Sequence, residues 1–185
     1  MIEKWPEWIR GDAARIISVD VETSGPNPAD YDLLSIGACT LIEPRQTFYV
    51  ELQPVSMRYT DEALQVHGLD LKELQQKGKK PADALEMFKA WLAESIPSTT
   101  PPLFLGFNAP FDWMFVNDYF FHYLGENPFG HSALDIKSFY MGAARVPWGS
   151  TSMKNISQVA LKHNALQDAC DQASLFARIV KGVVV

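Results

Sequence analysis

The chain has 185 residues, the size of one compact domain, and 47% of them are hydrophobic. Its net charge of −6 excludes a protein that coats nucleic acid through bulk positive charge, although it does not exclude a nucleic-acid enzyme. No apolar run approaches the ~20 residues that a membrane helix needs, and the N-terminus lacks the apolar segment of a secretory signal. We therefore expect a single domain over residues 1–185 that does not contact a membrane.

The two cysteines, Cys39 and Cys170, lie in apolar stretches. This placement is typical of reduced thiols in a protein core, and it predicts a cytoplasmic location. No Cys/His cluster with the spacing of a zinc site occurs in the sequence.

Three strands are predicted in the first third of the chain. Residues 16–21 and 33–42 are apolar runs, and residues 46–52 alternate between apolar and polar side chains. Only residues 43–45 connect the second run to the third, which favours a hairpin. The pattern predicts a three-stranded antiparallel meander.

Helical patterns follow from Thr60 onward. Residues 60–68 begin with Thr60 as a cap and end at Gly68, and residues 70–76 form a second short pattern. Residues 81–95 open with a proline and predict an apolar helix face made of Ala84, Met87, Phe88, Trp91 and Leu92.

The second half of the chain alternates strands and helices. Strands are predicted over residues 103–108 and at the start of 132–142, and helices over 110–125, the rest of 132–142, 153–162 and 165–180. Residues 146–152 read as a loop. This order predicts an α/β fold in which a mixed sheet, the antiparallel meander plus parallel strands, is flanked by helices.

Four carboxylates occur where a solvated surface charge is not expected. Asp20 and Glu22 end the first predicted strand on the same face, where their like charges repel. Asp112 opens an apolar helix directly after a buried strand, and Asp168 lies in the final helix. Each one alone could be an ordinary strand-end or helix-end acid. Together, at the carboxyl ends of strands where ligands gather, they indicate a site for two divalent cations that act on a phosphodiester.

The reaction also needs a base that takes a proton from the attacking water. His163 precedes Asp168 by five residues, and its ordinary pKa of about 6.5 suits this role near neutral pH. A surface loop histidine is the alternative interpretation of His163 on its own.

Three sequence blocks resemble the motifs of the DEDDh-type 3′–5′ exonucleases. They are D-x-E-T at residues 20–23, GFNAPFD at 106–112 and HNALQDA at 163–169. The blocks occur in the family's order and with similar spacing, over residues 16–180. The family includes ribonuclease T, oligoribonuclease and the proofreading subunit of bacterial DNA polymerase III. Its members have a ribonuclease-H-like fold, which the resemblance implies here.

The resemblance implies a role for each matching residue. Asp20, Glu22, Asp112 and Asp168 would bind two Mg²⁺ or Mn²⁺ ions, and His163 would be the general base. The positions implied to contact substrate are Thr23, Ser24, His67, Gly68, Asn108 and Phe111. A structural role for His67 is the alternative, because the match of residues 66–69 to the family is loose.

A group of basic and aromatic residues lies near the third block. Lys137, Arg145, Lys154 and Lys162 surround the later motifs, and Trp148 precedes a run of hydroxyl residues. A stacking aromatic beside a lysine suits a single strand entering the site. A loop anchored by its tryptophan is the alternative.

The sequence thus predicts a metal-dependent 3′–5′ exonuclease that releases nucleoside monophosphates from a single-stranded RNA or DNA end. Two alternatives stay open: an accessory proofreading or binding module of a polymerase or RNA-processing complex, and an endonuclease on the same fold. Some relatives dimerise to build their sites, so a homodimer is a further expectation from the resemblance.

Overall fold

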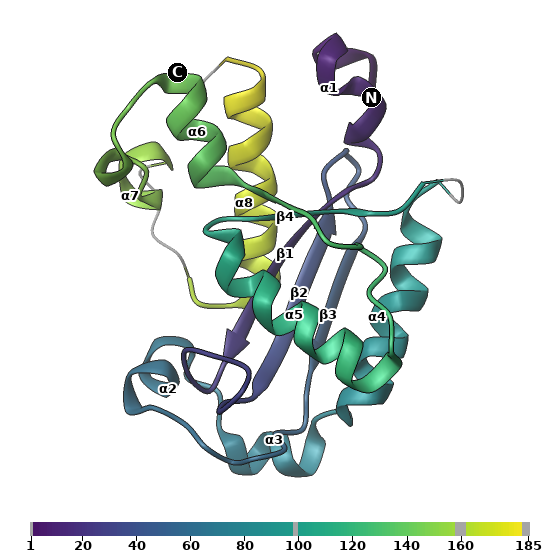
Figure 1. The fold of residues 1–185 in the computed structure, drawn as a ribbon, viewed down its shortest axis with the longest axis vertical. Helices are drawn as coiled ribbons and strands as arrows, with labels where there is room; N and C mark the ends of the chain where they lie inside the picture. Colours follow the sequence, from purple (N-terminus) through teal and green to yellow (C-terminus); the bar gives the residue numbers. More distant parts are fainter. Residues whose placement is uncertain (1, 98–99, 158–161, 183–185) are drawn as a thin grey trace.

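A computed structural model of the chain describes residues 2–97, 100–157 and 162–182. Its centre is a five-stranded sheet in the order β3-β2-β1-β4-β5 (Figure 1). The strands are β1 (Ile16–Thr23), β2 (Leu33–Thr40), β3 (Thr47–Glu51), β4 (Leu103–Gly106) and β5 (Ala133–Asp135). β1, β2 and β3 form the predicted antiparallel meander, and β4 and β5 pair in parallel on the other side of β1.

Helices cover both faces of this sheet. On one face α4 (Pro81–Ser95) and α5 (Ala109–Leu124) pack on the alternate β1 residues Ile17, Val19 and Val21. On the other face lie α1 (Glu7–Ala13), α6 (Ile136–Ala144) and α8 (Ala165–Val180). The predicted mixed sheet flanked by helices is confirmed.

The remaining elements are short. Helices α2 (Asp61–His67) and α3 (Leu71–Lys77) lie beyond the end of β1 in Figure 1, and α7 (Met153–Ser157) precedes α8. Two 3₁₀ turns, η1 (Ile2–Lys4) and η2 (Trp148–Ser150), complete the described elements. None of the helices in the described residues is both long and apolar enough to cross a membrane.

The structure differs from the sequence prediction in several places: α1 was not predicted, and β2 and β4 end earlier than expected. Met87 is 44% exposed, so its assignment to the inner face of α4 is wrong. The buried residues of α4 are Pro81, Ala84, Leu85, Phe88 and Leu92, a stripe that is centred away from Met87. The predicted helix over 153–162 is helical as far as Ser157, and residues 158–161 lie outside the described residues.

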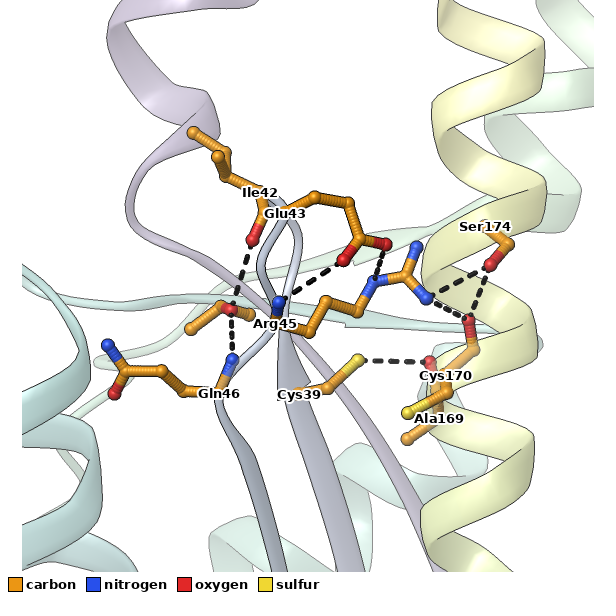
Figure 2. A network of polar contacts seen from close by, with 9 residues as sticks. Cys39, Ile42, Glu43, Arg45, Gln46, Ala169, Cys170 and Ser174 are labelled. Atoms are coloured by element: carbon orange, nitrogen blue, oxygen red, sulfur yellow. Dashed lines mark hydrogen bonds and ion pairs between the residues drawn. The ribbon is translucent and has the colours of Figure 1, made fainter. Parts of the chain in front are cut away.

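Figure 2 shows the polar network that joins the β2–β3 connection to α8. The guanidinium of Arg45 donates from Nη1 to the Cys170 carbonyl and to the Ser174 hydroxyl, both at 3.0 Å. Its Nε lies 3.2 Å from a carboxylate oxygen of Glu43. Both cysteines are free thiols, as predicted, but Cys170 is half-buried whereas Cys39 is in the core. This network fixes one side of α8 against the sheet.

Candidate active site

The site is built at the carboxyl end of β1, where Asp20 and Glu22 point to the face that α8 covers. Their carboxylate oxygens and one of Asp168 all lie within 4.8 Å of one another. The pairing of β1 with β2 shifts register between Glu22 and Thr23. Such irregularities increase local twist and are common beside active sites, where they re-aim side chains.

A glycine in β2 allows α8 to bring Asp168 this close. Gly37 pairs with Asp20, and a Cβ atom built on Gly37 would lie 2.1 Å from the carbonyl carbon of Ala165, at the start of α8. No side chain fits in that space. The close approach of backbone to backbone therefore sets the distance between Asp20 and Asp168.

Asp112 is the fourth carboxylate, and it comes from the first turn of α5. Its Oδ1 accepts a hydrogen bond from the Val21 backbone N–H at 3.1 Å, so α5 is joined to β1 between the two other acids. Asn108, with φ of 64°, turns the chain from β4 into this helix in a left-handed conformation that asparagine tolerates.

The sequence interpretation missed Gln172. This residue is 1% exposed, and its Nε2 donates to Oδ1 of Asp20 at 2.5 Å while its Oε1 accepts from the Phe107 N–H at 3.0 Å. Gln172 therefore orients Asp20. Its place four residues after Asp168, on the same face of one helix, was the available signal.

The electrostatics of the four acids are those of a cluster that lacks positive charge. Burial, followed by the charges of Asp112, Glu22 and Asp168, raises the pKa of Asp20 well above its ordinary value. Burial and the nearby Asp168 raise the pKa of Glu22 to about 7. Burial raises the pKa of Asp112 to about 8, although the hydrogen bond from the Val21 N–H favours the ionised carboxylate and lowers the pKa.

These residues fit divalent cations. Carboxylate oxygens are the ligands that Mg²⁺ and Mn²⁺ prefer, and like-charged buried acids gain most from a bound cation. Among the described residues, no lysine or arginine forms an ion pair with any of the four. The four acids thus offer carboxylate oxygens that suit a divalent cation, and no ion pair balances their charge within the part of the chain that the structure describes.

His163 is exposed at the mouth of the same site, in a left-handed conformation with φ of 54°. The carboxylate of Asp168 accepts hydrogen bonds from the backbone N–H groups of the residues directly before and after His163. Its Oδ1 accepts from the Lys162 N–H at 2.9 Å and its Oδ2 from the Asn164 N–H at 3.3 Å. Strained backbone of this kind persists where the surroundings determine it, often at active sites.

His67 lies nearby but has no free ring nitrogen. Its Nδ1 accepts from the Leu69 N–H at 3.0 Å, so its Nε2 carries the proton and donates to the Thr23 carbonyl at 3.2 Å. Burial lowers the pKa of His67. A neutral histidine with both nitrogens in use ties α2 to β1 and does not act as a base.

A cavity of about 730 Å³ opens over the carboxylates. The five predicted catalytic residues all line it, and so do four of the predicted substrate contacts: Thr23, His67, Asn108 and Phe111. Ser24 and Gly68 do not line it. The Ser24 hydroxyl is buried and accepts from the Asp32 N–H, and Gly68 ends α2 in a left-handed conformation. The other wall residues include Ala63 and Val66 of α2 and Lys137 of α6.

Comparison with known proteins points in one direction. The model of the Exonuclease family (RNase T) matches residues 17–176. The chain is 45% identical over 178 residues to the 3′-5′ DNA exonuclease Cap18 of Escherichia coli, covering 94% of this chain and 95% of that protein.

Solved structures share the fold at low identity. The nuclease domain of 3′hExo, a DEDDh family member bound to rAMP, superposes with a TM-score of 0.75 at 14% identity, covering 91% of this chain and 92% of that one. E. coli exonuclease I with a dA16 oligonucleotide gives a TM-score of 0.67 at 18% identity, over 90% of this chain and 41% of that one.

Proposed function

We propose a division of roles among the residues of the candidate active site. The chain belongs to the DEDDh-type 3′–5′ exonuclease family and is a metal-dependent 3′–5′ exonuclease. Asp20, Glu22, Asp112 and Asp168 hold two Mg²⁺ or Mn²⁺ ions. The convergence of these four acids on one cavity, with no lysine or arginine in an ion pair with them among the described residues, carries this proposal. Such a pair of ions, when bound, stabilises the charge on the attacking and leaving oxygens of a phosphoryl displacement.

His163 acts as the general base. It is the one histidine of the cavity lining with no ring nitrogen engaged in a hydrogen bond among the described residues, whereas both nitrogens of His67 are used. Its ring accepts a proton from water as the water oxygen bonds to the scissile phosphorus. The bond from phosphorus to the 3′ oxygen of the preceding nucleotide then breaks, which releases a nucleoside 5′-monophosphate.

The substrate is the 3′ end of a single strand. The cavity volume is typical of a site for one small ligand and suits one terminal nucleotide. Thr23, Asn108 and Phe111 line it with the polar and aromatic groups that a nucleoside can contact. We assign DNA rather than RNA as the preferred substrate, because the relative with 45% identity is named a DNA exonuclease.

One panel of substrates tests the activity and the choice of DNA. Linear single strands of DNA and RNA with a 5′ label, and a circular DNA strand, are incubated with Mg²⁺, Mn²⁺ or a chelator. We expect a ladder of products shortened one nucleotide at a time, faster from DNA, and no product with chelator. Cleavage of the circle would assign an endonuclease, and faster decay of RNA would overturn the DNA assignment.

His163→Ala tests the base. We expect kcat to fall by roughly 10²–10⁴-fold while the Mg²⁺ dependence of activity is kept, because a general base acts in the proton-transfer step and does not bind the ion. His122→Ala is the matched control, since His122 is exposed on α5 with its ring against Tyr123. A kcat in His163→Ala equal to that of the control would assign the base elsewhere.

A homodimer and a cytoplasmic location stay predictions. The free thiols of Cys39 and Cys170 agree with a reducing compartment. Light scattering of the purified chain and fractionation of cells test the two predictions.

A further inference from the structure

The cavity has one lysine in its wall, and this lysine has no acidic partner within the described residues. Lys137 is the second residue of α6 and is half-buried. Its Nζ lies 4.2 Å from the ring centroid of Trp148 and 6.0 Å from that of Phe107. The ammonium group is thus held by an aromatic face, although five carboxylates line the same cavity, the four of the site and that of Glu62.

The fold positions Lys137 through the start of α6. Asp135 ends β5 and accepts from the Ser138 N–H at 2.9 Å, which caps α6. The same carboxylate accepts from the Ala109 N–H at 3.0 Å, at the start of α5. The helix that carries Lys137 is therefore tied to the helix that carries Asp112.

Trp148 is anchored separately. The Trp148 carbonyl accepts from the hydroxyl of Thr151 at 2.8 Å, and Thr151 is fully buried. The Trp148 side chain is nevertheless 50% exposed. A tryptophan that only anchored a loop would bury its ring, whereas this ring contacts a lysine and also faces solvent.

The cavity has two unlike sides. The side near α2 carries Ala63, Val66 and the acidic Glu62 and has no lysine or arginine among its described lining residues, whereas Lys137 and Phe107 form the side near α6. The carboxylates lie among these walls. If the terminal nucleoside lies against Ala63 and Val66, the next phosphate is repelled by Glu62 on that side, and the rest of the strand leaves past the ammonium group of Lys137.

We propose that Lys137 binds the phosphate on the 5′ side of the scissile phosphate, and that Trp148 positions the lysine and stacks on the base beside that phosphate. This inference rests on the exonuclease function proposed above. Lysine ammonium groups are common phosphate ligands, and base stacking on an exposed aromatic ring is independent of sequence. Lys137 is then a substrate-binding residue that distinguishes longer strands from a single terminal linkage.

The test compares two short substrates. The dinucleotide TpT contains only the scissile phosphate, whereas TpTpT also contains the next phosphate. For the unmodified protein we expect kcat/KM to be roughly tenfold higher with TpTpT, mainly through a lower KM. Lys137→Met should abolish this gain, because kcat/KM should fall roughly tenfold more for TpTpT than for TpT, and Lys137→Arg should keep most of the gain.

Salt dependence provides a second measurement. For a longer single strand, the slope of log KM against log salt should fall by about 0.7 in Lys137→Met, the amount for one lost phosphate contact. Trp148→Ala should raise KM for TpTpT but not for TpT, and Trp148→Phe should restore it. Lys154→Met, an exposed lysine of α7, is the matched control and should change neither substrate.

Three results would overturn the inference: no gain from the second phosphate in the unmodified protein, an equal gain in Lys137→Met, or an equal loss on both substrates. An unmodified protein that hydrolyses neither substrate in Mg²⁺ or Mn²⁺ would instead contradict the exonuclease function. The two failures are therefore distinguishable.

Discussion

Helix α8 borders two polar clusters that differ in how their charge is balanced. At the β2–β3 connection, Arg45 has its partners within the chain: the Glu43 carboxylate, the Cys170 carbonyl and the Ser174 hydroxyl (Figure 2). Near the start of the same helix, four buried or half-buried acids have no lysine or arginine in an ion pair with them, as far as the described residues go.

The difference separates a structural cluster from a functional one. A buried polar group normally keeps its partners in the folded protein, because an unpaired one costs stability. Asp20, Asp112 and Asp168 do accept hydrogen bonds, but among the described residues no ion pair balances the charge of the cluster. The raised pKa values of Asp20, Glu22 and Asp112 reflect the cost of this buried, unbalanced charge. A ligand that supplies positive charge removes it. Five changes test this contrast, beginning with the largest expected effect on activity.

Asp20→Asn should reduce kcat by more than about 10³-fold, because a lost metal ligand removes several kcal/mol of transition-state stabilisation. The fold should persist, since asparagine can still accept from Gln172 and one repelling charge is gone. Nuclease assays and thermal melts check both expectations. Asp118→Asn, an exposed acid of α5, is the control. Activity near that of the control would exclude Asp20 from the metal site.

Gly37→Ala should reduce kcat by about 10²-fold, because its methyl group forces the start of α8 away from β2 and displaces Asp168 by a fraction of an ångström or more. Gly142→Ala is the matched control, since a Cβ atom at Gly142 meets nothing within 4 Å. Circular dichroism establishes that both variants fold. A folded Gly37→Ala protein with full activity would show that the close approach is not needed.

Gln172→Met should raise the Mg²⁺ concentration that gives half-maximal activity by roughly 10–100-fold. The reason is that Gln172 orients Asp20 without being a ligand itself. Activity at saturating Mg²⁺ should recover more fully than in Asp20→Asn. A Mg²⁺ titration of both variants measures the difference. An unchanged titration would mean that Asp20 needs no orienting partner.

Removal of the divalent ion should make stability depend on pH. The pKa values of about 7 for Glu22 and about 8 for Asp112 exceed the ordinary values near 4, so the folded ion-free protein binds more protons than the unfolded chain. The contribution of these two groups to the stability of the ion-free protein is therefore greatest below pH 4 and is lost as pH rises from about 4 to 8. We expect Mg²⁺ to raise Tm by several degrees more at pH 8.5 than at pH 5.5. An equal shift at both pH values would contradict this.

Arg45→Met should have the smallest effect on activity and a clear effect on stability. It removes two charge-assisted hydrogen bonds and the ion pair with Glu43, which predicts a loss of about 1.5–3 kcal/mol. The Mg²⁺ dependence of activity should match the unmodified protein. Chemical denaturation and a Mg²⁺ titration give the two measurements, and a changed Mg²⁺ dependence would link the two clusters through α8.

The sequence by itself determined the fold class and the composition of the candidate site. The meander, the α4 and α8 boundaries and the five cavity-lining catalytic candidates all depend on local patterns: apolar period, capping residues and short motifs. Met87 shows the limit of such patterns. Periodicity defines a stripe on a helix, but only the packed sheet decides where the stripe is centred.

The tertiary structure alone decided which groups meet. Gly37 is 128 residues from the Ala165 backbone that it touches, and Gln172 is 152 residues from Asp20. The neutral state of His67, the burial of Ser24 and the contact of Lys137 with Trp148 likewise depend on distant partners. Spacing along a chain specifies the neighbours within one element. Contacts between elements follow from how closely two backbones can approach, which only the folded chain determines.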